Sequence, residues 1–131
     1  MQTNLSIIIP MYNEEDRINA LIVNLENFRK NFVKYKNVEI IFVDDGSKDK
    51  TIEKIKQYKS SFYNIKIIEN NHQGQMFSIF TGIDKSNYNT IITLEADLPV
   101  NLDNILNCVS LLSKYDLIIG TRFGGKKIIG K

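Results

Sequence analysis

The chain has 131 residues, 43% hydrophobic and 24% charged, a balance typical of one soluble globular domain. Its net charge of +2 comes from scattered lysines and arginines, which argues against a nucleic-acid-binding protein with a concentrated basic face. The single cysteine, Cys108, excludes an internal disulfide. No apolar run approaches the roughly 20 residues that span a bilayer, and the N-terminus does not resemble a signal peptide, so we expect a cytoplasmic protein.

The first half of the chain alternates between short β-rich runs and segments with helical periodicity. Residues 5–10 (LSIIIP) predict a buried strand, and residues 38–43 (VEIIFV) predict a second. An amphipathic helix follows each strand, and Asp49 is the expected N-cap of the second helix. The hydrophobic positions at helical spacing are Ile18, Leu21, Ile22, Leu25 and Phe28, then Ile52 and Ile55.

The second half continues this alternation. Residues 65–68, 90–94 and 117–120 predict three further strands, with two amphipathic helices between them. Asn101 is the expected N-cap of the last helix, and we expect both hydrophobic stripes, Met and aromatic members included, to face the core. The stripes consist of Met76, Ile79, Phe80 and Ile83, then Leu102, Ile105, Leu106, Val109 and Leu112.

This order of elements predicts an α/β fold: a mostly parallel sheet with helices on both faces, in a three-layer, Rossmann-like arrangement. We expect residues 1–123 to form one domain, and the Gly- and Lys-rich residues 124–131 to form a flexible tail or the start of a continuation. In an open parallel sheet, ligands bind beyond the carboxyl ends of the strands. The segments that follow the predicted strands are therefore the places to look for a site.

Acidic side chains gather in these segments. Glu14 follows the first strand, Asp44 and Asp45 follow the second, and Glu95 and Asp97 follow the fourth. In a common cleft they would repel one another, and a divalent cation, a hydrogen-bonding ligand or both would relieve the repulsion. Glu95 and Asp97 supply the one or two carboxylates that Mg²⁺ takes beside phosphate oxygens. The triplet Glu95-Ala96-Asp97 also suits a solvated turn in which Asp97 caps a backbone group. On these residues alone, a metal site and a solvated turn both stay open.

Three further residues stand at the predicted strand ends. The guanidinium of Arg122 suits a phosphate, although it suits a solvated surface equally well. Gly74 stands where the third strand turns into a helix, and helix N-termini favour phosphates. His72 could line the same cleft, but it lacks a partner for a zinc site and is interpreted as a loop residue. Neither a Walker A sequence nor G-x-G-x-x-G occurs, which argues against a P-loop NTPase and a dinucleotide-binding domain.

These motifs, taken in order, resemble the family 2 glycosyltransferases of the GT-A fold, especially the branch of dolichol- and polyprenyl-phosphate sugar synthases. The motifs in residues 8–15 and 43–51 are specific to this family when they occur together, and the ordered set of five segments covers nearly the whole chain. The matching segments are 8–15 (IIPMYNEE), 43–51 (VDDGSKDKT), 71–83 with its two glycines, 95–98 (EADL) and 120–122 (GTR).

The resemblance implies a nucleotide pocket at the ends of the first strands. Asp45 would contact the base, with Asp44 beside it. The nucleotide-binding set expected in this way is Pro10, Tyr12, Glu14, Asp44, Asp45 and Gly74.

The resemblance also implies a divalent cation on the donor diphosphate. Asp97 would hold the Mg²⁺ or Mn²⁺, and Glu95 stands in the place of the family's usual first aspartate. Arg122 would approach the donor or acceptor phosphates, so Asp97 and Arg122 are the expected catalytic residues. Pro99 stands where lipid-phosphate sugar synthases often have a metal-binding Gln, which removes one ligand.

The implied reaction transfers a sugar from a UDP- or GDP-sugar to an acceptor. In the similar branch this acceptor is a polyprenyl phosphate, which would bring the protein to the cytoplasmic face of a membrane. The alternative is a non-catalytic nucleotide-sugar-binding module, or a fragment without the acceptor site, because the chain stops shortly after Arg122. A nucleotidyltransferase is less consistent with the sequence, because residues 11–14 (MYNE) are not rich in glycine and arginine.

Overall fold

The computed structural model describes residues 3–97 and 102–118 of the chain. It divides into two compact units, Met1–Leu98 and Pro99–Lys131. The first unit contains a sheet with its covering helices, and the second contains helix α4 (Leu102–Leu111). The candidate site lies wholly within the first unit, which is described from here on.

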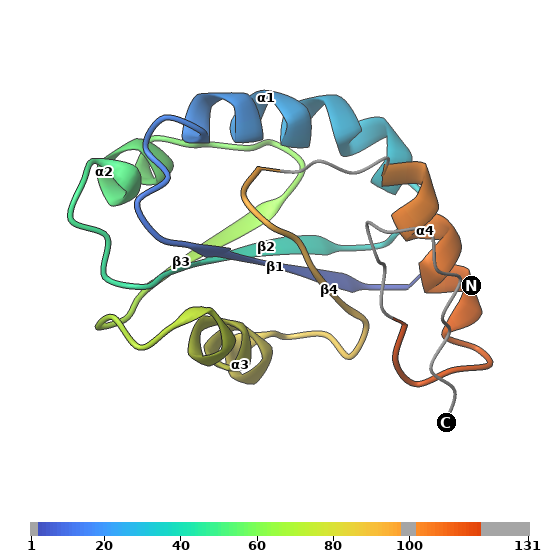
Figure 1. The fold of residues 1–131 in the computed structure, drawn as a ribbon. Coiled ribbons are helices and arrows are strands. Elements are labelled where there is room, and N and C mark those ends of the chain that lie inside the picture. Colours follow the sequence, from blue (N-terminus) through green and yellow to red (C-terminus); the bar gives the residue numbers. More distant parts are fainter. Residues whose placement is uncertain (1–2, 98–101, 119–131) are drawn as a thin grey trace. The chain divides into compact units, whose positions relative to one another are not determined.

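Four parallel strands form the sheet, in the order β3-β2-β1-β4 (Figure 1). The central strands are β1 (Leu5–Met11) and β2 (Val38–Asp44), and the edge strands are β3 (Asn64–Glu69) and β4 (Ile91–Thr93). The central strands pair along their whole lengths, so both end at the same level. Since all strands are parallel, their carboxyl ends lie at one edge of the sheet.

Helices cover both faces of this sheet. On one face lie α1 (Ile18–Asn27) and α2 (Thr51–Lys56), and on the other lies α3 (Gln75–Lys85) (Figure 1). A short 3-10 helix, η1 (Phe28–Phe32), extends α1. This three-layer α/β arrangement confirms the predicted fold class.

The core lies on the two central strands because both of their faces are covered. Every residue of β2 is buried, and β1 is buried except for the half-buried Pro10. Ile8, Ile41 and Val43 form a fully buried cluster at their centre. Continuous hydrophobic runs such as those predicted for these two strands are what a doubly covered parallel sheet requires.

The prediction that the whole hydrophobic stripe of α3 faces the core was wrong. Met76 and Phe80 are each 60% exposed and Ile83 is 41% exposed, while the buried residues of the helix are Ser78 and Gly82. Small residues face the sheet because α3 lies very close to β1. A Cβ added at Gly82 would lie 2.5 Å from Cγ2 of the core residue Ile8.

The fifth predicted strand is not present in the described residues. Leu117 and Ile118 belong to no strand, and the other two residues of the predicted strand lie outside the described ranges. The expected cap Asn101, the predicted site residue Arg122 and the predicted tail 124–131 also lie outside these ranges.

The close approach of α3 to β1 predicts a strict size limit at Gly82. The substitution Gly82→Ala should lower the free energy of unfolding by about 1–3 kcal/mol, because the added methyl overlaps Ile8 in a packed core. Urea denaturation measures this change. The double variant Gly82→Ala/Ile8→Ala should lose clearly less than the sum of the two single variants, and strictly additive losses would contradict the contact.

Candidate functional site

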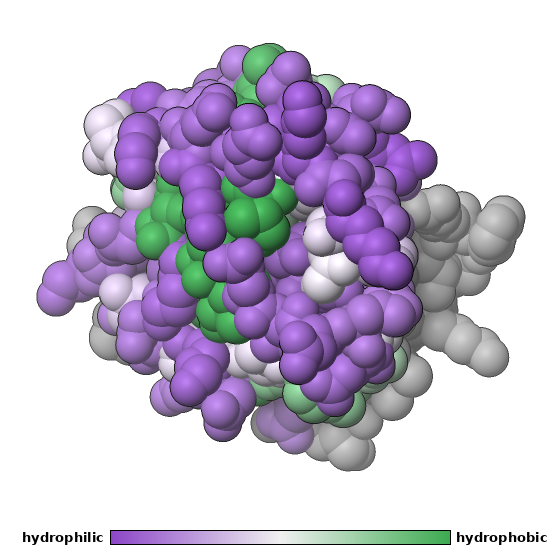
Figure 2. Space-filling model, turned by 90° about the vertical axis from the view of Figure 1, so that its left-hand side faces the viewer, coloured by the Kyte–Doolittle hydropathy of each residue, from purple (hydrophilic) through white to green (hydrophobic). Residues whose placement is uncertain are grey.

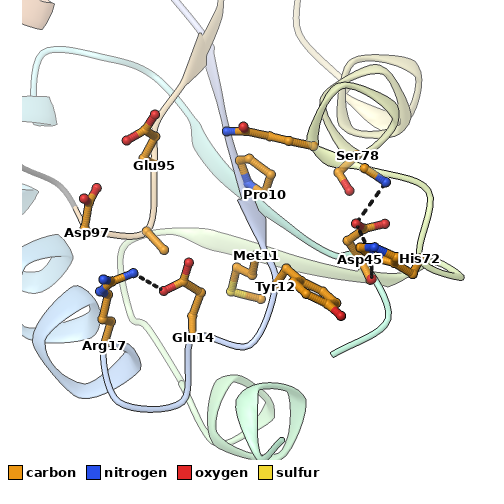
Figure 3. Close-up of a pocket in the computed structure, with 13 residues that line it drawn as sticks. Pro10, Met11, Tyr12, Glu14, Arg17, Asp45, His72, Ser78, Glu95 and Asp97 are labelled. Carbon is orange, nitrogen blue, oxygen red and sulfur yellow. Dashed lines mark hydrogen bonds and ion pairs between the residues drawn. The ribbon is translucent and has the colours of Figure 1, made fainter. Parts of the chain in front are cut away.

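A cavity of about 370 Å³ lies at the carboxyl ends of the central strands (Figure 3). Its walls come from the end of β1 with the following turn, the residue after β2, the entry into α3 and the segment after β4. The face on which the strands end is mostly hydrophilic around a central hydrophobic area (Figure 2). The predicted site residues that line the cavity are Pro10, Tyr12, Glu14, Asp45, Gly74, Glu95 and Asp97.

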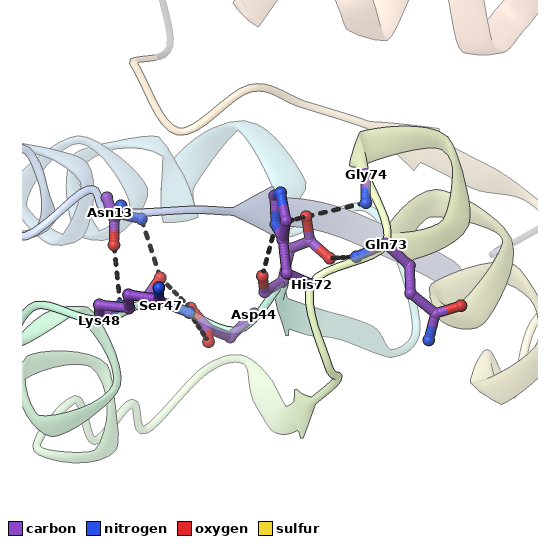
Figure 4. A network of polar contacts seen from close by, with 8 residues as sticks. Asn13, Asp44, Ser47, Lys48, His72, Gln73 and Gly74 are labelled. Atoms are coloured by element: carbon purple, nitrogen blue, oxygen red, sulfur yellow. Dashed lines mark hydrogen bonds and ion pairs between the residues drawn. The ribbon is translucent and has the colours of Figure 1, made fainter.

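Asp45 anchors one side of the cavity. Its side chain is buried, with 4% of the residue exposed, and its carboxylate accepts the backbone N–H of Gln73 at 2.7 Å and of Gly74 at 3.0 Å (Figures 3 and 4). His72 Nδ1 lies 2.8 Å from the same carboxylate. A buried carboxylate is tolerated where such hydrogen bonds replace water. Asp45 therefore holds the β3–α3 loop against the end of β2.

Asp44, predicted beside Asp45 in the nucleotide set, does not line the cavity. It is buried and accepts hydrogen bonds from the backbone N–H of Ser47 at 2.9 Å and from its hydroxyl at 2.5 Å. Within this turn Gly46 has φ +77°, and a Cβ there would lie 2.9 Å from the backbone N of His72. The structure thus places Asp44 in the turn that carries Asp45.

The turn after β1 is attached to the turn after β2 (Figure 4). The backbone N–H of Asn13 donates to Ser47 Oγ at 2.8 Å, and that of Glu14 donates to Thr51 Oγ1 at 2.8 Å. In return, Lys48 N–H donates to Asn13 Oδ1 at 2.9 Å. These bonds join residues more than 30 positions apart, so they fix the wall of the cavity that the first turn provides.

The N-cap of α2 is Lys50 rather than the predicted residue, and Asp49 lies one position before it. Its carboxylate accepts the backbone N–H of Thr51 at 2.9 Å, at the start of α2, and the N–H of Glu15 at 3.2 Å. Burial raises the pKa of Asp49, but the hydrogen bonds from Thr51 and Glu15 outweigh burial and hold this pKa below its ordinary value. The same carboxylate thus joins the start of α2 to the turn that follows β1.

Tyr12 and His72 form an aromatic wall beside Asp45. Their ring centroids lie 4.4 Å apart and their planes are inclined by 29°. Tyr12 is 39% exposed, and both side chains line the cavity. A partly exposed pair of flat rings next to a carboxylate suits a planar ligand group that also carries a hydrogen-bond donor.

Glu95 and Asp97 lie on the opposite side of the cavity, in the segment that follows β4 (Figure 3). Both side chains are exposed to solvent. Arg17 lies near them and makes an ion pair with Glu14 at 2.9 Å. The hydrogen bond and charge of Glu14, with a smaller contribution from Asp97, raise the pKa of Arg17. This side of the cavity is thus charged and open to water.

The donor atoms at Glu95 and Asp97 fit a hard divalent cation. Mg²⁺ takes one or two protein carboxylates, and its other ligands are water and phosphate oxygens. Within residues 3–97 and 102–118, no group of three or more His, Cys, Asp or Glu side chains is placed to hold a metal ion. Two carboxylates are the number that Mg²⁺ takes where water and phosphate oxygens complete its coordination shell.

Arg17 and Ser78 are among the lining residues that the sequence did not predict. Arg17 stands three residues after Glu14, a spacing typical of ion pairs along a helix. This spacing could have indicated from the sequence that Arg17 lies beside Glu14. Ser78 is fully buried, and its position four residues before Gly82 marks the small-residue face of α3. His72 was interpreted as a loop residue that could line the same cleft, and the structure places this loop residue in the cavity wall.

The fold is of the GT-A type, and the chain belongs to Glycosyl transferase family 2, whose model matches residues 6–130. It is 32% identical over 124 residues to the undecaprenyl-phosphate 4-deoxy-4-formamido-L-arabinose transferase of Pseudomonas fluorescens, covering 93% of this chain and 36% of that protein. It is 30% identical over 125 residues to the dolichol-phosphate mannosyltransferase of Pyrococcus furiosus, covering 92% of this chain and 34% of that protein.

Solved structures share the fold. The mannosyltransferase PcManGT of Pyrobaculum calidifontis, solved with GDP-Man and Mn²⁺, superposes with a TM-score of 0.71 at 20% identity, covering 86% of this chain and 33% of that one. The chain thus spans about a third of the length of the relatives that it matches. Among the residues described, no helix is long and apolar enough to cross a membrane.

The attachment between the two turns predicts a local effect of Thr51→Val. This isosteric change removes the acceptor of the Glu14 N–H, so the free energy of unfolding should fall by about 1–3 kcal/mol. Hydrogen exchange should become faster at the Glu14 amide, while the amides of β1 keep their protection. Thr93→Val, at an exposed position of β4, is the matched control. Unchanged exchange at Glu14 would contradict the account.

Proposed function

We propose that this chain binds a nucleotide-diphosphate sugar together with Mg²⁺ or Mn²⁺, and that it does so as the donor-binding part, residues 1–123, of a family 2 glycosyltransferase. The main observation in support of this proposal is that the two sides of the cavity differ in chemistry. One side has an aromatic wall and a buried acceptor, and the other has two exposed carboxylates.

The nucleoside fits the side that contains Tyr12, His72 and Asp45. Stacked rings accept a flat base, and the Asp45 carboxylate accepts hydrogen bonds from N–H or O–H groups. A phosphate does not fit beside this carboxylate, because the two negative charges would repel each other. The base and ribose are therefore the parts of the donor that suit this side, and Pro10 and Gly74 also line the cavity.

The diphosphate fits the side that contains Glu95 and Asp97, where a divalent cation can bridge protein and phosphate oxygens. When bound, such a cation supplies positive charge that stabilises the departing nucleoside diphosphate. The chain itself contributes the two carboxylates and a nearby guanidinium, Arg17, which adds positive charge next to Asp97. The structural relative solved with GDP-Man and Mn²⁺ supports this combination of ligands.

A polyprenyl phosphate is the proposed acceptor, and the cytoplasmic face of a membrane is the proposed place of reaction. The name of the Pseudomonas fluorescens relative, an undecaprenyl-phosphate transferase, supports this choice. A phosphate acceptor is already a charged nucleophile, so it needs no protein base to remove a proton. Arg122, which follows the last predicted strand, is proposed to approach the donor or acceptor phosphates.

A nucleotide-binding assay tests the proposal as a whole. UDP-, GDP- and dTDP-sugars should be screened by thermal shift with and without Mn²⁺, and product formation with a polyprenyl phosphate should be followed for any nucleotide that binds. At least one donor should raise the melting temperature in a metal-dependent way. No metal-dependent shift with any of them would overturn the proposal, and binding without transfer would favour a binding module.

The metal assignment predicts that Asp97→Asn abolishes the effect of Mn²⁺ on nucleotide affinity. Loss of the charged ligand should weaken UDP or GDP binding in Mn²⁺ by about ten-fold or more, with little change in stability because the side chain is exposed. Isothermal titration calorimetry measures both affinities. Asp84→Asn, an exposed position of α3 that does not line the cavity, is the control. Unchanged affinity in Mn²⁺ would show that Asp97 does not hold the metal.

A further inference from the structure

Arg17 is a permanent positive charge in a cavity that is otherwise acidic. Four carboxylates line the cavity, those of Glu14, Asp45, Glu95 and Asp97, and Arg17 is the only lysine or arginine among the lining residues in the described part of the chain. A diphosphate would bring further negative charge into this space. One divalent cation offsets only part of the resulting repulsion, so the guanidinium is the protein group that favours a phosphate here.

The guanidinium lies on the side of the cavity proposed for the diphosphate. Figure 3 shows Arg17 on the same side as Asp97, away from the aromatic wall of Tyr12 and His72. The charge of Asp97 contributes to the raised pKa of Arg17, so the two side chains lie within electrostatic reach of each other. A nucleotide whose base stacks on the aromatic wall would therefore bring its distal phosphate, the one farther from the base, toward Arg17.

Glu14 holds Arg17 and leaves part of the guanidinium for a ligand. Nη1 of Arg17 donates to one carboxylate oxygen of Glu14 at 2.9 Å, and the backbone N–H of Glu14 donates to Thr51 Oγ1. A guanidinium has five N–H groups in a planar fork, which can also bind two phosphate oxygens. The Arg17 side chain is 60% exposed, so a ligand in the cavity can reach these N–H groups.

We propose that Arg17 binds the distal phosphate of the donor and thereby selects nucleoside diphosphates over monophosphates. This inference rests on the proposed function. Glu14 is the positioning residue, because its carboxylate orients the guanidinium. A monophosphate lacks the distal group and leaves Arg17 in contact with Glu14 alone. The protein therefore contributes a phosphate contact of its own in addition to the one that the cation mediates.

Paired nucleotides isolate the distal phosphate. UDP and UMP differ only in that group, as do GDP and GMP, and isothermal titration calorimetry in Mn²⁺ measures the affinities of the pair that binds. Arg17→Gln, which removes the charge, should weaken binding of the diphosphate by about ten-fold and change that of the monophosphate by less than about two-fold. Arg17→Lys, which keeps the charge without the planar fork, should bind the diphosphate with intermediate affinity.

Arg29→Gln is the matched control. Arg29 pairs with Glu26 at 3.2 Å, with the same spacing of three residues, and it does not line the cavity. This variant loses the same charge and the same kind of ion pair, so it should keep the parent's affinities for both nucleotides. Without nucleotide, the Arg17 and Arg29 variants should both melt close to the parent protein, because exposed ion pairs contribute little to stability.

A measurement in EDTA separates a direct contact from an effect on the cation. Without the cation both nucleotides should bind more weakly, but the parent protein should still prefer the diphosphate, and Arg17→Gln should lose this preference. The inference would be overturned by equal losses for diphosphate and monophosphate in Arg17→Gln, by no loss, or by a parent protein without preference in EDTA. In these cases the proposed function would still stand. If neither UDP nor GDP binds in Mn²⁺, the proposed function itself fails, and this inference fails with it.

Discussion

The arrangement of the site depends on two adjacent buried carboxylates at the end of β2. Asp44 and Asp45 are 2% and 4% exposed, and neither has a lysine or arginine to neutralise it among the ion pairs of the described residues. Backbone N–H groups stabilise them instead, which requires the chain to bring those groups close. Asp44 thereby closes its own turn, and Asp45 holds the entry into α3.

This constraint gives the two sides of the cavity different properties. On the side of Asp45 the polar groups are buried and held in place by hydrogen bonds, so this side of the cavity is preorganised for a ligand. On the side of Glu95 and Asp97 the carboxylates are exposed, and within the described part of the chain they belong to no group of three or more potential metal ligands. In the proposed function, a donor nucleotide with its cation completes that second side, so that the planar base and the charged diphosphate occupy opposite sides of one cavity.

The sequence was sufficient to predict the fold class, and most of the predicted site residues that the structure describes line one cavity. Continuous hydrophobic runs identified the parallel strands, and the rule that ligands bind at strand ends led to Asp45 and Asp97. Helical periodicity was not sufficient for α3, because it does not reveal which face of a helix meets the sheet. The hydroxyl of Ser78, which has no hydrogen-bond partner among the described residues, and the turn-closing bonds of Asp44 depend on the detailed course of the backbone, so a residue pattern does not indicate them.

The most direct measurement is the paramagnetic effect of Mn²⁺ on the amide NMR signals of the protein in the presence of UDP or GDP. The account predicts that broadening centres on the amides of residues 95–97, while the nucleotide itself shifts the amides of Tyr12, Gln73 and Gly74. Both effects should be present in one complex, because the two sides belong to one cavity. Broadening centred on another acidic part of the surface, or a nucleotide that leaves the β3–α3 loop unshifted, would contradict the account.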